Sequence, residues 1–329
     1  MHRPAPSSRL FPGALILLAA LAFSASTAIA QTYPNRAIKI LQGFAAGGNA
    51  DTIARVIGVE LGKTLGQPFV VEARVGAGGN LASDAVAKSP PDGYTLALLT
   101  GGHTASGALY KTLPFDPAES FEMISTISQF PFLFTVRADS PYQTLPALLA
   151  AARAKPESVA YGTAGIGSTH HLTGALLASM AGAPFFHVPY KGDAAAITSL
   201  LGGDIPLVVA TPTVAVAHVK AGKLKVIATS GGTRWSGMPD VPTASEGGVP
   251  GFDVRSWIGL AAPAGTPRAI IERLHAEVQR AIQLPEVRER LESFGGEARG
   301  STPAEMRERV IAEVARWKKV IAESKIPQQ

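Results

Sequence analysis

Two glycine-rich loops could bind an anion. They are residues 43–51 (GFAAGGNAD) and 162–170 (GTAGIGSTH), each preceded by a short apolar run and followed by apolar residues at helical spacing. A turn between a strand and a helix places unpaired backbone N–H groups at the positive end of the helix dipole. Together the loops predict the two halves of a site for a carboxylate, sulfate or phosphate. Either loop alone is equally explained by glycine permitting a tight strand-to-helix turn.

Familiar catalytic and cofactor motifs do not fit these loops. Residues 165–170 (GIGSTH) carry His170 where a dinucleotide fingerprint needs its third glycine, and residues 76–81 (GAGGNL) carry Leu81 there. No Lys-Ser or Lys-Thr pair follows a glycine-rich loop, and Ser168 does not lie in a Gly-x-Ser-x-Gly turn. We therefore expect no catalytic residue and no cofactor.

Three histidines are candidates for other chemistry. His170 and His171 begin a predicted helix, where adjacent side chains point apart, and a metal site needs three or four converging ligands, so we expect no metal. His103 follows the apolar run 95–99, and ligand sites gather at such strand ends in α/β sheets. It is a candidate site residue, with a structural hydrogen-bonding role as the alternative.

Two further turns follow apolar runs. In residues 188–193, Tyr190 could close over a ligand and the amides around Gly192 could add hydrogen-bond donors. Lys191 in the same turn is either a ligand contact or an exposed surface charge. Thr211 is a candidate contact because it directly follows another apolar run.

Positioning these turns requires an α/β fold. Apolar runs suited to buried strands alternate with helical patterns, at residues 38–42, 69–72, 95–99, 132–136, 159–161, 186–188, 205–209, 226–229 and 257–261. The stretch 121–136 suits a strand that passes from one lobe into another, and 257–262 suits the return. The length exceeds what one core usually serves. We expect one lobe from residues 31–131 and 257–329, and a second from 132–256.

The C-terminal part predicts two amphipathic helices. Thr266 is expected to cap the first and Pro267 to open it, with an apolar stripe of Ile270, Leu274, Val278 and Ile282. Residues 302–305 (TPAE) form a capping box for the second, whose stripe is Met306, Val310, Val314, Trp317 and Ile321. Residues 231–251 are rich in Gly, Pro and Ser and predict an irregular segment.

The first thirty residues predict a cleaved secretory signal, with an uncleaved anchor as the alternative. They have a basic start, an apolar stretch too short to span a bilayer comfortably, and an Ala-x-Ala site at 28–30. We therefore expect a periplasmic protein. The chain has no cysteine, which excludes disulfides and thiolate chemistry. A formal charge of +5, scattered along helices, gives no basic face for nucleic acid.

The order of its motifs makes the sequence resemble the substrate-binding proteins of tripartite tricarboxylate transporters, the Bug receptors. The matching segments run from residue 33 to the last helix: 33–34 (YP), 44–51, 76–80 (GAGGN), 91–96 (PDGYTL), 165–172, 187–192 (HVPYKG), 220–224 (KAGKL) and 260–267 (LAAPAGTP). No single segment would suffice, but their order over this length is specific.

The resemblance implies an α/β, two-lobed periplasmic binding protein-like (type II) fold with an interlobe ligand cleft. It implies a receptor that closes on a small organic acid and delivers it to membrane permease subunits, and we expect a monomer. By position, the ligand-binding residues implied are Phe44, Gly48, Asn49, Ala50 and Asp51 in the first loop and Gly167, Ser168 and Thr169 in the second. Asp51 suits a helix-capping or loop-bracing role better than contact with another carboxylate.

Three departures from the family pattern bear on the ligand. Residues 45–46 are Ala-Ala where relatives usually carry two prolines, and 100–102 (TGG) are smaller than the usual polar pair. Residues 210–212 (ATP) replace an Asp-Asn pair, which argues against a ligand with a cationic amino group on that side. We therefore expect a mono- or dicarboxylate without a charged amine.

Two other functions remain open from the sequence. The protein could present its ligand to a sensor kinase instead of a permease, and a neighbouring permease or sensor gene would discriminate between these outputs. It could also be a secreted enzyme acting on an organic acid, which turnover of a bound acid would reveal, although the missing motifs weigh against it.

Overall fold

The computed structural model describes residues 33–323 and 326–329, and the contacts considered below lie within residues 36–329. The expected signal, residues 1–30, lies outside the described residues. Among the described helices, none combines the length and the apolar character that crossing a membrane requires.

Within the described residues, the first sheet has six strands in the order β11-β4-β10-β3-β1-β2. They are β1 (Ile38–Gln42), β2 (Phe69–Ala73), β3 (Thr95–Thr100), β4 (Phe121–Pro131), β10 (Arg255–Pro263) and β11 (Glu297–Ala298). Strand β1 is parallel to β2 and β3, whereas β10 is antiparallel to both β3 and β4. Each of the parallel strands β1, β2 and β3 is followed by a helix, so their carboxyl ends open toward helix starts.

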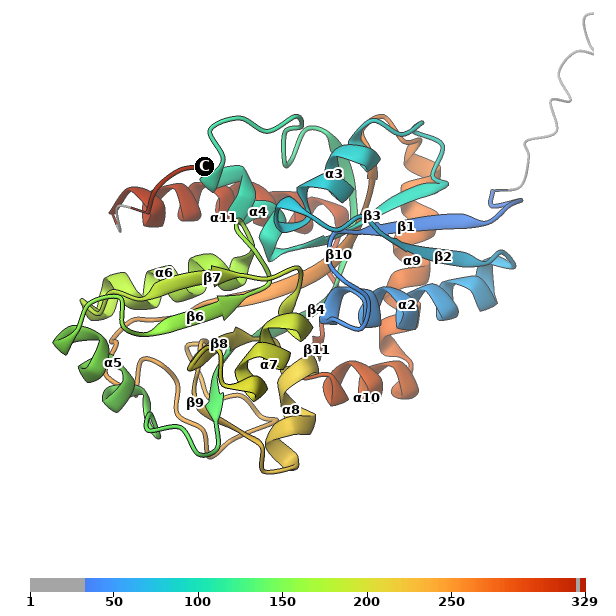
Figure 1. Ribbon diagram of the computed structural model, residues 1–329. Coiled ribbons are helices and arrows are strands. Elements are labelled where there is room, and N and C mark those ends of the chain that lie inside the picture. The colour runs from blue at the N-terminus through green and yellow to red at the C-terminus, as the bar shows by residue number, and fades with distance from the viewer. Residues whose placement is uncertain (1–32, 324–325) are drawn as a thin grey trace, which may run out of the picture. The chain divides into compact units, whose positions relative to one another are not determined.

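The second sheet of the described chain has five strands in the order β7-β6-β8-β5-β9. They are β5 (Leu133–Arg137), β6 (Ala160–Thr163), β7 (Phe186–Pro189), β8 (Leu207–Ala210) and β9 (Leu224–Thr229). Strand β6 runs parallel to β7 and β8, and β5 is antiparallel to β8 and β9. In Figure 1, β6 to β9 lie apart from β1 to β3, which shows the two sheets as separate bodies of structure. The α/β plan expected from the sequence is confirmed.

Helices follow most strands. They are α2 (Asn49–Leu65), α3 (Asn80–Ala87), α4 (Gly101–Leu109), α5 (Leu145–Ala154), α6 (Thr169–Ala181), α7 (Asp193–Gly202), α8 (Pro212–Lys220), α9 (Arg268–Gln283), α10 (Pro285–Ser293) and α11 (Pro303–Glu323). Side-chain caps begin several of them: the Thr100 hydroxyl accepts from Gly102 N at the start of α4, and the Thr144 hydroxyl accepts from Ala147 N at the start of α5.

The C-terminal region differs from expectation in two details. The capping box is confirmed, because Thr302 N donates to Glu305 and Glu305 N donates to Thr302 Oγ1. The expected cap at Thr266 is wrong: Pro267 is the N-cap residue of α9, and the Thr266 hydroxyl donates to Pro263 O instead. The short helix α10 is not apparent from the sequence, because its nine residues give too little periodicity to separate it from α9.

Each sheet has its own apolar core. The first contains Leu41, Leu99, Phe121 and Trp257 together with Val310 of α11, all buried. Trp257 also donates its Nε1–H to Glu313 Oε2 at 2.8 Å, so the one polar atom of this ring has a partner. The second core contains Leu133, Leu200, Val208, Val226 and Trp235. Separate cores allow each sheet to keep its form while the connection between them bends.

The chain crosses between the sheets where the sequence predicts one continuous strand. Pro131 is the last residue of β4 and pairs with Arg255 in the first sheet, whereas Leu133 pairs in the second sheet. Phe132, between them, belongs to neither strand, and its backbone N–H and carbonyl bond to Ser230 instead. The stretch 121–136 is therefore two strands. The chain returns with β10 at Arg255, and the expected lobe boundaries at 131/132 and 256/257 stay a prediction.

Ser230 ties the outgoing and returning crossings together. Its buried hydroxyl accepts from Phe132 N at 2.8 Å and donates to Val254 O at 2.6 Å. Its backbone N donates to Phe132 O, and its carbonyl accepts from Val254 N. One serine therefore satisfies backbone groups on both crossing segments.

We predict that Ser230→Ala lowers the free energy of unfolding by about 2–3 kcal/mol, because it leaves a buried N–H and a buried carbonyl without this partner. Urea unfolding measures the change. The matched control is Ser236→Ala at an exposed serine of the irregular segment that follows Ser230, expected to change stability by less than about 0.5 kcal/mol. Equal stability of the two variants would contradict the bridging role of Ser230.

His103 lies inside the first core. Its ring centroid is 5.5 Å from that of Phe115 and 5.1 Å from that of Phe121. Nε2 lies 2.8 Å from Pro117 O and Nδ1 lies 3.2 Å from the Ser83 hydroxyl, which assigns the proton to Nε2 because a carbonyl can only accept. Burial lowers the pKa of His103 to about 4 despite the opposing effect of the Pro117 carbonyl.

A lowered histidine pKa makes stability pH-dependent. The unfolded chain takes up a proton at His103 near pH 6.5 while the folded chain resists it down to about pH 4, so stability falls as the pH drops through this window. We predict that His103 contributes a loss of about 1.6 kcal/mol between pH 6.5 and pH 5. Urea unfolding at both pH values should show a smaller loss for His103→Gln than for the wild type or for His218→Gln, a control on α8. An equal loss in all three proteins would refute this assignment.

Candidate functional site

Five helix starts meet at one place. The pocket there is lined by Asn49 of α2, Thr100 at the N-cap of α4, Thr169 of α6, Asp193 of α7 and Thr211 at the N-cap of α8. Helices α2 and α4 follow strands of the first sheet, and the other three follow strands of the second. The first N–H groups of a helix have no partner inside the helix and lie at its positive end. The pocket therefore collects hydrogen-bond donors and positive potential from both sheets.

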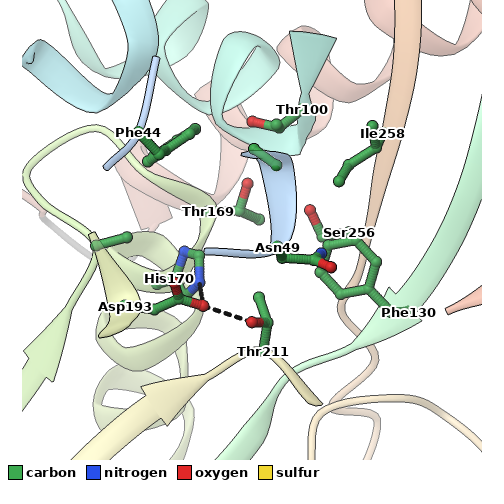
Figure 2. Close-up of a pocket in the computed structure, with 12 residues that line it drawn as sticks. Phe44, Asn49, Thr100, Phe130, Thr169, His170, Asp193, Thr211, Ser256 and Ile258 are labelled. Atoms are coloured by element: carbon green, nitrogen blue, oxygen red, sulfur yellow. Dashed lines mark hydrogen bonds and ion pairs between the residues drawn. The ribbon is translucent and has the colours of Figure 1, made fainter. Parts of the chain in front are cut away.

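In this arrangement of the loops the pocket has a cavity volume of about 30 Å³, room for one or two water molecules. Apolar walls come from Phe44, Phe130 and Ile258, which Figure 2 shows around the polar groups at the centre. The complete lining is Phe44, Asn49, Ala50, Thr100, Phe130, Ala164, Thr169, His170, Asp193, Thr211, Ser256 and Ile258. An acid with a carbon skeleton would find donors at the helix starts and apolar contacts at the walls.

Two side chains of the pocket have polar atoms without partners among the described residues. The Thr169 hydroxyl is buried and has no hydrogen bond, and neither ring nitrogen of His170 has one. Both residues are less than a tenth exposed. A buried polar atom without a partner is costly, so such atoms in a pocket indicate groups that a ligand completes.

Asp193 is the one acidic side chain that lines the pocket within the described residues. It is buried, and its Oδ2 accepts a short hydrogen bond from the Thr211 hydroxyl and lies 3.7 Å from His170 Nε2. Burial would raise the pKa of Asp193, but the contacts with His170 and Thr211 outweigh it and hold that pKa below the usual 3.8. Asp193 is therefore a carboxylate, also favoured by its place in the first turn of α7.

This carboxylate corrects one inference from the sequence. Ala210 predicts that this side of the site has no acid, and that prediction is wrong. The next residue, Thr211, donates to Asp193, so an acid from the start of α7 stands on the same side. The sequence signal for it is an acid directly after Gly192 at a helix start, which by itself also fits an ordinary turn.

Five of the residues expected from the sequence line the pocket together: Phe44, Asn49, Ala50, Thr169 and Thr211. Two more lie beside it. A Cβ atom at Gly48 would come within 3.2 Å of Asp193 Oδ1, and Gly192 is the N-cap residue of α7 with φ +129°. Ligand contact by any of these residues stays a prediction.

The remaining first-loop residue, Asp51, braces its own helix. Its carboxylate pairs with Arg55 at 2.9 Å and accepts from Gly47 N at 3.2 Å. Burial would raise the pKa of Asp51, but Arg55 and the Gly47 N–H outweigh it and keep that pKa below its usual value. Asp51 does not line the pocket.

In the second loop, Ser168 is the N-cap residue of α6. Its hydroxyl accepts from His171 N and donates to Gly165 O at 2.6 Å, and its own N–H also donates to Gly165 O. Gly167 accepts a hydrogen bond from Ser106 at its carbonyl. Both residues shape the loop that carries Thr169, and neither lines the pocket.

Two expected residues lie elsewhere. His103 is enclosed in the first core, as described above. The Tyr190 hydroxyl donates to Ser199 at 2.7 Å, and the Tyr190 ring borders a neighbouring surface pocket with Lys191 and Phe44. The expectation that Tyr190 closes over a ligand stays a prediction.

Seven lining residues are outside the expected set of ligand-binding residues: Thr100, Phe130, Ala164, His170, Asp193, Ser256 and Ile258. Of these, Ala164 and His170 lie in the second predicted loop, and Thr100 lies in the 100–102 segment already linked to the ligand. Phe130, Ser256 and Ile258 lie on β4 and β10, the strands that cross toward the second sheet. Both strands are buried along nearly their whole length, so no alternation of polar and apolar residues indicates which side chains face a cavity. Only the pairing of β4 with β10 brings these residues together.

Loops from the two sheets touch beside the pocket. Gly78, with φ +65°, packs so closely that a Cβ atom there would lie 2.7 Å from Ile166 O. Ser106 of α4 donates to Gly167 O at 3.2 Å, and the Thr213 hydroxyl of α8 donates to Asn49 Oδ1. These contacts enclose the pocket between the sheets.

No group of three or more potential metal-binding side chains gathers in the part of the chain that the structure describes. The His170 and Asp193 pair is one imidazole and one carboxylate, short of the ligand number that metal sites use.

Comparison with known proteins gives the family. Residues 53–326 match the model of the tripartite tricarboxylate transporter family receptor. Protein BugT of Bordetella pertussis is 34% identical over 90% of this chain and 91% of its own length. The structure of R. palustris Rpa4515 with adipate is 34% identical, with a TM-score of 0.86 over 90% of this chain and 99% of that one. MatC from Rhodopseudomonas palustris with bound malate is 34% identical, with a TM-score of 0.84 over 88% and 100%.

The similarity covers both sheets and the helices whose starts form the pocket. It confirms the two-lobed fold expected from the resemblance. The chain belongs to the tripartite tricarboxylate transporter receptor family, the Bug family of solute-binding receptors.

Proposed function

We propose that this receptor captures a small organic acid in the pocket of five helix starts and delivers it to the permease of a tripartite transporter. The convergence of those helix starts on the unpartnered Thr169 and His170 carries the proposal. Two relatives with the same fold were solved with adipate and with malate, both organic acids. A carboxylate is the group that several helix N-termini and a free hydroxyl hold best.

In the proposed complex, one carboxylate lies at the starts of α2 and α6. The backbone N–H groups of Asn49 and Ala50 and the hydroxyl of Thr169 are its donors, while Phe44 and Phe130 pack on the carbon skeleton. No lysine or arginine lines this pocket among the described residues, so helix dipoles and hydrogen bonds balance the ligand charge.

We also propose the lobe boundaries, the location, the oligomeric state and the absence of catalysis that are expected from the sequence. Residues 31–131 and 257–329 form the first lobe, 132–256 form the second, and the receptor acts as a periplasmic monomer after removal of residues 1–30. It performs no catalysis: the Ser168 hydroxyl is bonded to a backbone carbonyl, and His170 has no bonded hydroxyl that it could activate. Turnover of a bound acid by the purified protein would overturn this part.

The Thr169 hydroxyl is the side-chain donor that we test first. We predict that Thr169→Val, which keeps the volume, weakens binding of adipate or malate by about ten- to a hundredfold, the effect of losing a hydrogen bond to a charged acceptor. Isothermal titration calorimetry measures the dissociation constant. Thr198→Val, at an exposed threonine of α7, is the matched control and should bind as the wild type does. An unchanged constant in Thr169→Val would remove this hydroxyl from the site.

Gly78 tests whether the lobes must close. A methyl group there meets the backbone of the second loop, and a positive φ further disfavours alanine. We predict that Gly78→Ala holds the lobes apart, weakens acid binding at least tenfold and raises the radius of gyration of the liganded protein in small-angle scattering. Gly222→Ala, also at a positive φ but with open space around it, is the control for backbone strain alone. Normal binding and a compact liganded state in Gly78→Ala would show that this contact does not limit closure.

A further inference from the structure

We propose that the acid bound by this pocket also carries a cationic nitrogen, and that Asp193 is the residue that binds it. The inference rests on the proposed function, because it concerns the second end of the same ligand. It reverses the expectation, drawn from Ala210, of an acid without an amine.

The charges that line the pocket favour such a ligand. Among the described lining residues, Asp193 is the one carboxylate, His170 is the one residue that can become cationic, and no lysine or arginine is present. A dicarboxylate would therefore bring two further negative charges into a buried space with Asp193 and without a fixed cation. A zwitterion places its own carboxylate at the helix starts and its cation against Asp193, so the filled pocket gains no net charge.

The position of Asp193 fits a binding role. Figure 2 shows its carboxylate at the pocket wall, between His170 and Thr211. Thr211 holds Oδ2 from α8, while Oδ1 lies toward Gly48 at the start of α2. The Thr211 hydroxyl from α8 thus fixes the direction of Oδ2 before any ligand arrives, as a preorganised acceptor requires.

His170 does not donate a hydrogen bond to the Asp193 carboxylate. Its Nε2 lies 3.7 Å from Oδ2, beyond hydrogen-bond distance, and neither of its nitrogens has a hydrogen-bond partner. The groups that face Asp193 are therefore the Thr211 hydroxyl and backbone N–H from α8, the imidazole from α6 and the backbone at Gly48 from α2. Of these only the Thr211 hydroxyl donates a hydrogen bond to the carboxylate by its side chain. A ligand ammonium group would supply the missing charge-assisted bond.

The two ends of the ligand are assigned by the same geometry. Thr169 and the first residues of α2 offer donors, which suit a carboxylate, whereas Asp193 offers an acceptor. The apolar side chains Phe44, Phe130 and Ile258 lie around the space between them. The chemical class is therefore a small acid with an ammonium group, of which amino acids are the simplest examples.

The test is calorimetry on the full mature protein with matched acids. The probes are succinate, malate and aspartate, which differ at one carbon atom, and glutarate, glutamate, butyrate and 4-aminobutyrate. We expect the best amine-bearing acid to bind at least tenfold more tightly than its matched acid without nitrogen. Asp193→Asn should lower the ratio of the two dissociation constants at least tenfold. Asp240→Asn, the same change at an exposed position, should leave this ratio unchanged.

Each outcome supports or refutes the inference. If the wild type binds acids but binds their amine-bearing counterparts no more tightly, the cationic nitrogen is refuted and the receptor function stands. The same conclusion follows if malate binds more tightly than succinate while no amine-bearing acid binds more tightly than its counterpart. If Asp193→Asn is folded by circular dichroism and keeps the preference, another group binds the amine and the assignment to Asp193 fails. If none of the acids binds, both the proposed function and this inference are refuted. The wild-type comparison alone tests for the cationic nitrogen even if Asp193→Asn does not fold.

Discussion

The starts of five helices leave backbone N–H groups that need partners, and the rest of the structure is arranged around that need. Strands β1, β3, β6, β7 and β8 each end in a turn that leads directly into one of these helices. Because the two sheets contribute helices to the same pocket, neither alone presents the whole set of donors. The combined positive potential explains how a pocket without lysine or arginine among its described lining residues can hold an acid.

Asp193 belongs to the same electrostatic arrangement. It lies in the first turn of α7 and receives the hydroxyl of Thr211 at the N-cap of α8, so two of the five helix starts already share a resident carboxylate. Helices α2, α4 and α6 also begin at the pocket lining, and the starts of α2 and α6 lie close to this carboxylate. The pocket therefore combines helix-start donors with one resident carboxylate acceptor, the arrangement on which the proposed ligand chemistry rests.

Bending between the sheets depends on a few buried groups. Phe132 and Val254 lie on the two crossing segments and are both bonded to Ser230. Ser106 and Gly78 make contacts between loops of the two sheets near the pocket. The hydrogen bonds of Ser230 lie within the segments that connect the two sheets. The loop contacts of Ser106 and Gly78 can break without disrupting either apolar core. Closure on a ligand therefore has a physical basis in the separation of these two sets of contacts.

The sequence predicts the parts of this site that depend on local order along the chain. The glycine loops, the strand-to-helix pattern and the capping box at Thr302 are local, and each is where the sequence indicates. Phe130 and Ser256 cannot be found in this way, because uniformly buried strands give no sign of which side chains border a cavity. Asp193 escapes prediction for a different reason: its role arises from contact with Thr211 and His170, which are distant in sequence and meet only after the second sheet has formed.

The most direct test of acid binding at the helix starts is a crystal structure of the protein with the acid that binds it most tightly. We expect a ligand carboxylate within hydrogen-bond distance of the Thr169 hydroxyl and of backbone N–H groups at the start of α2, inside the pocket of Figure 2. A ligand carboxylate bound outside this pocket, or held inside it without any contact to a helix start, would contradict the central claim.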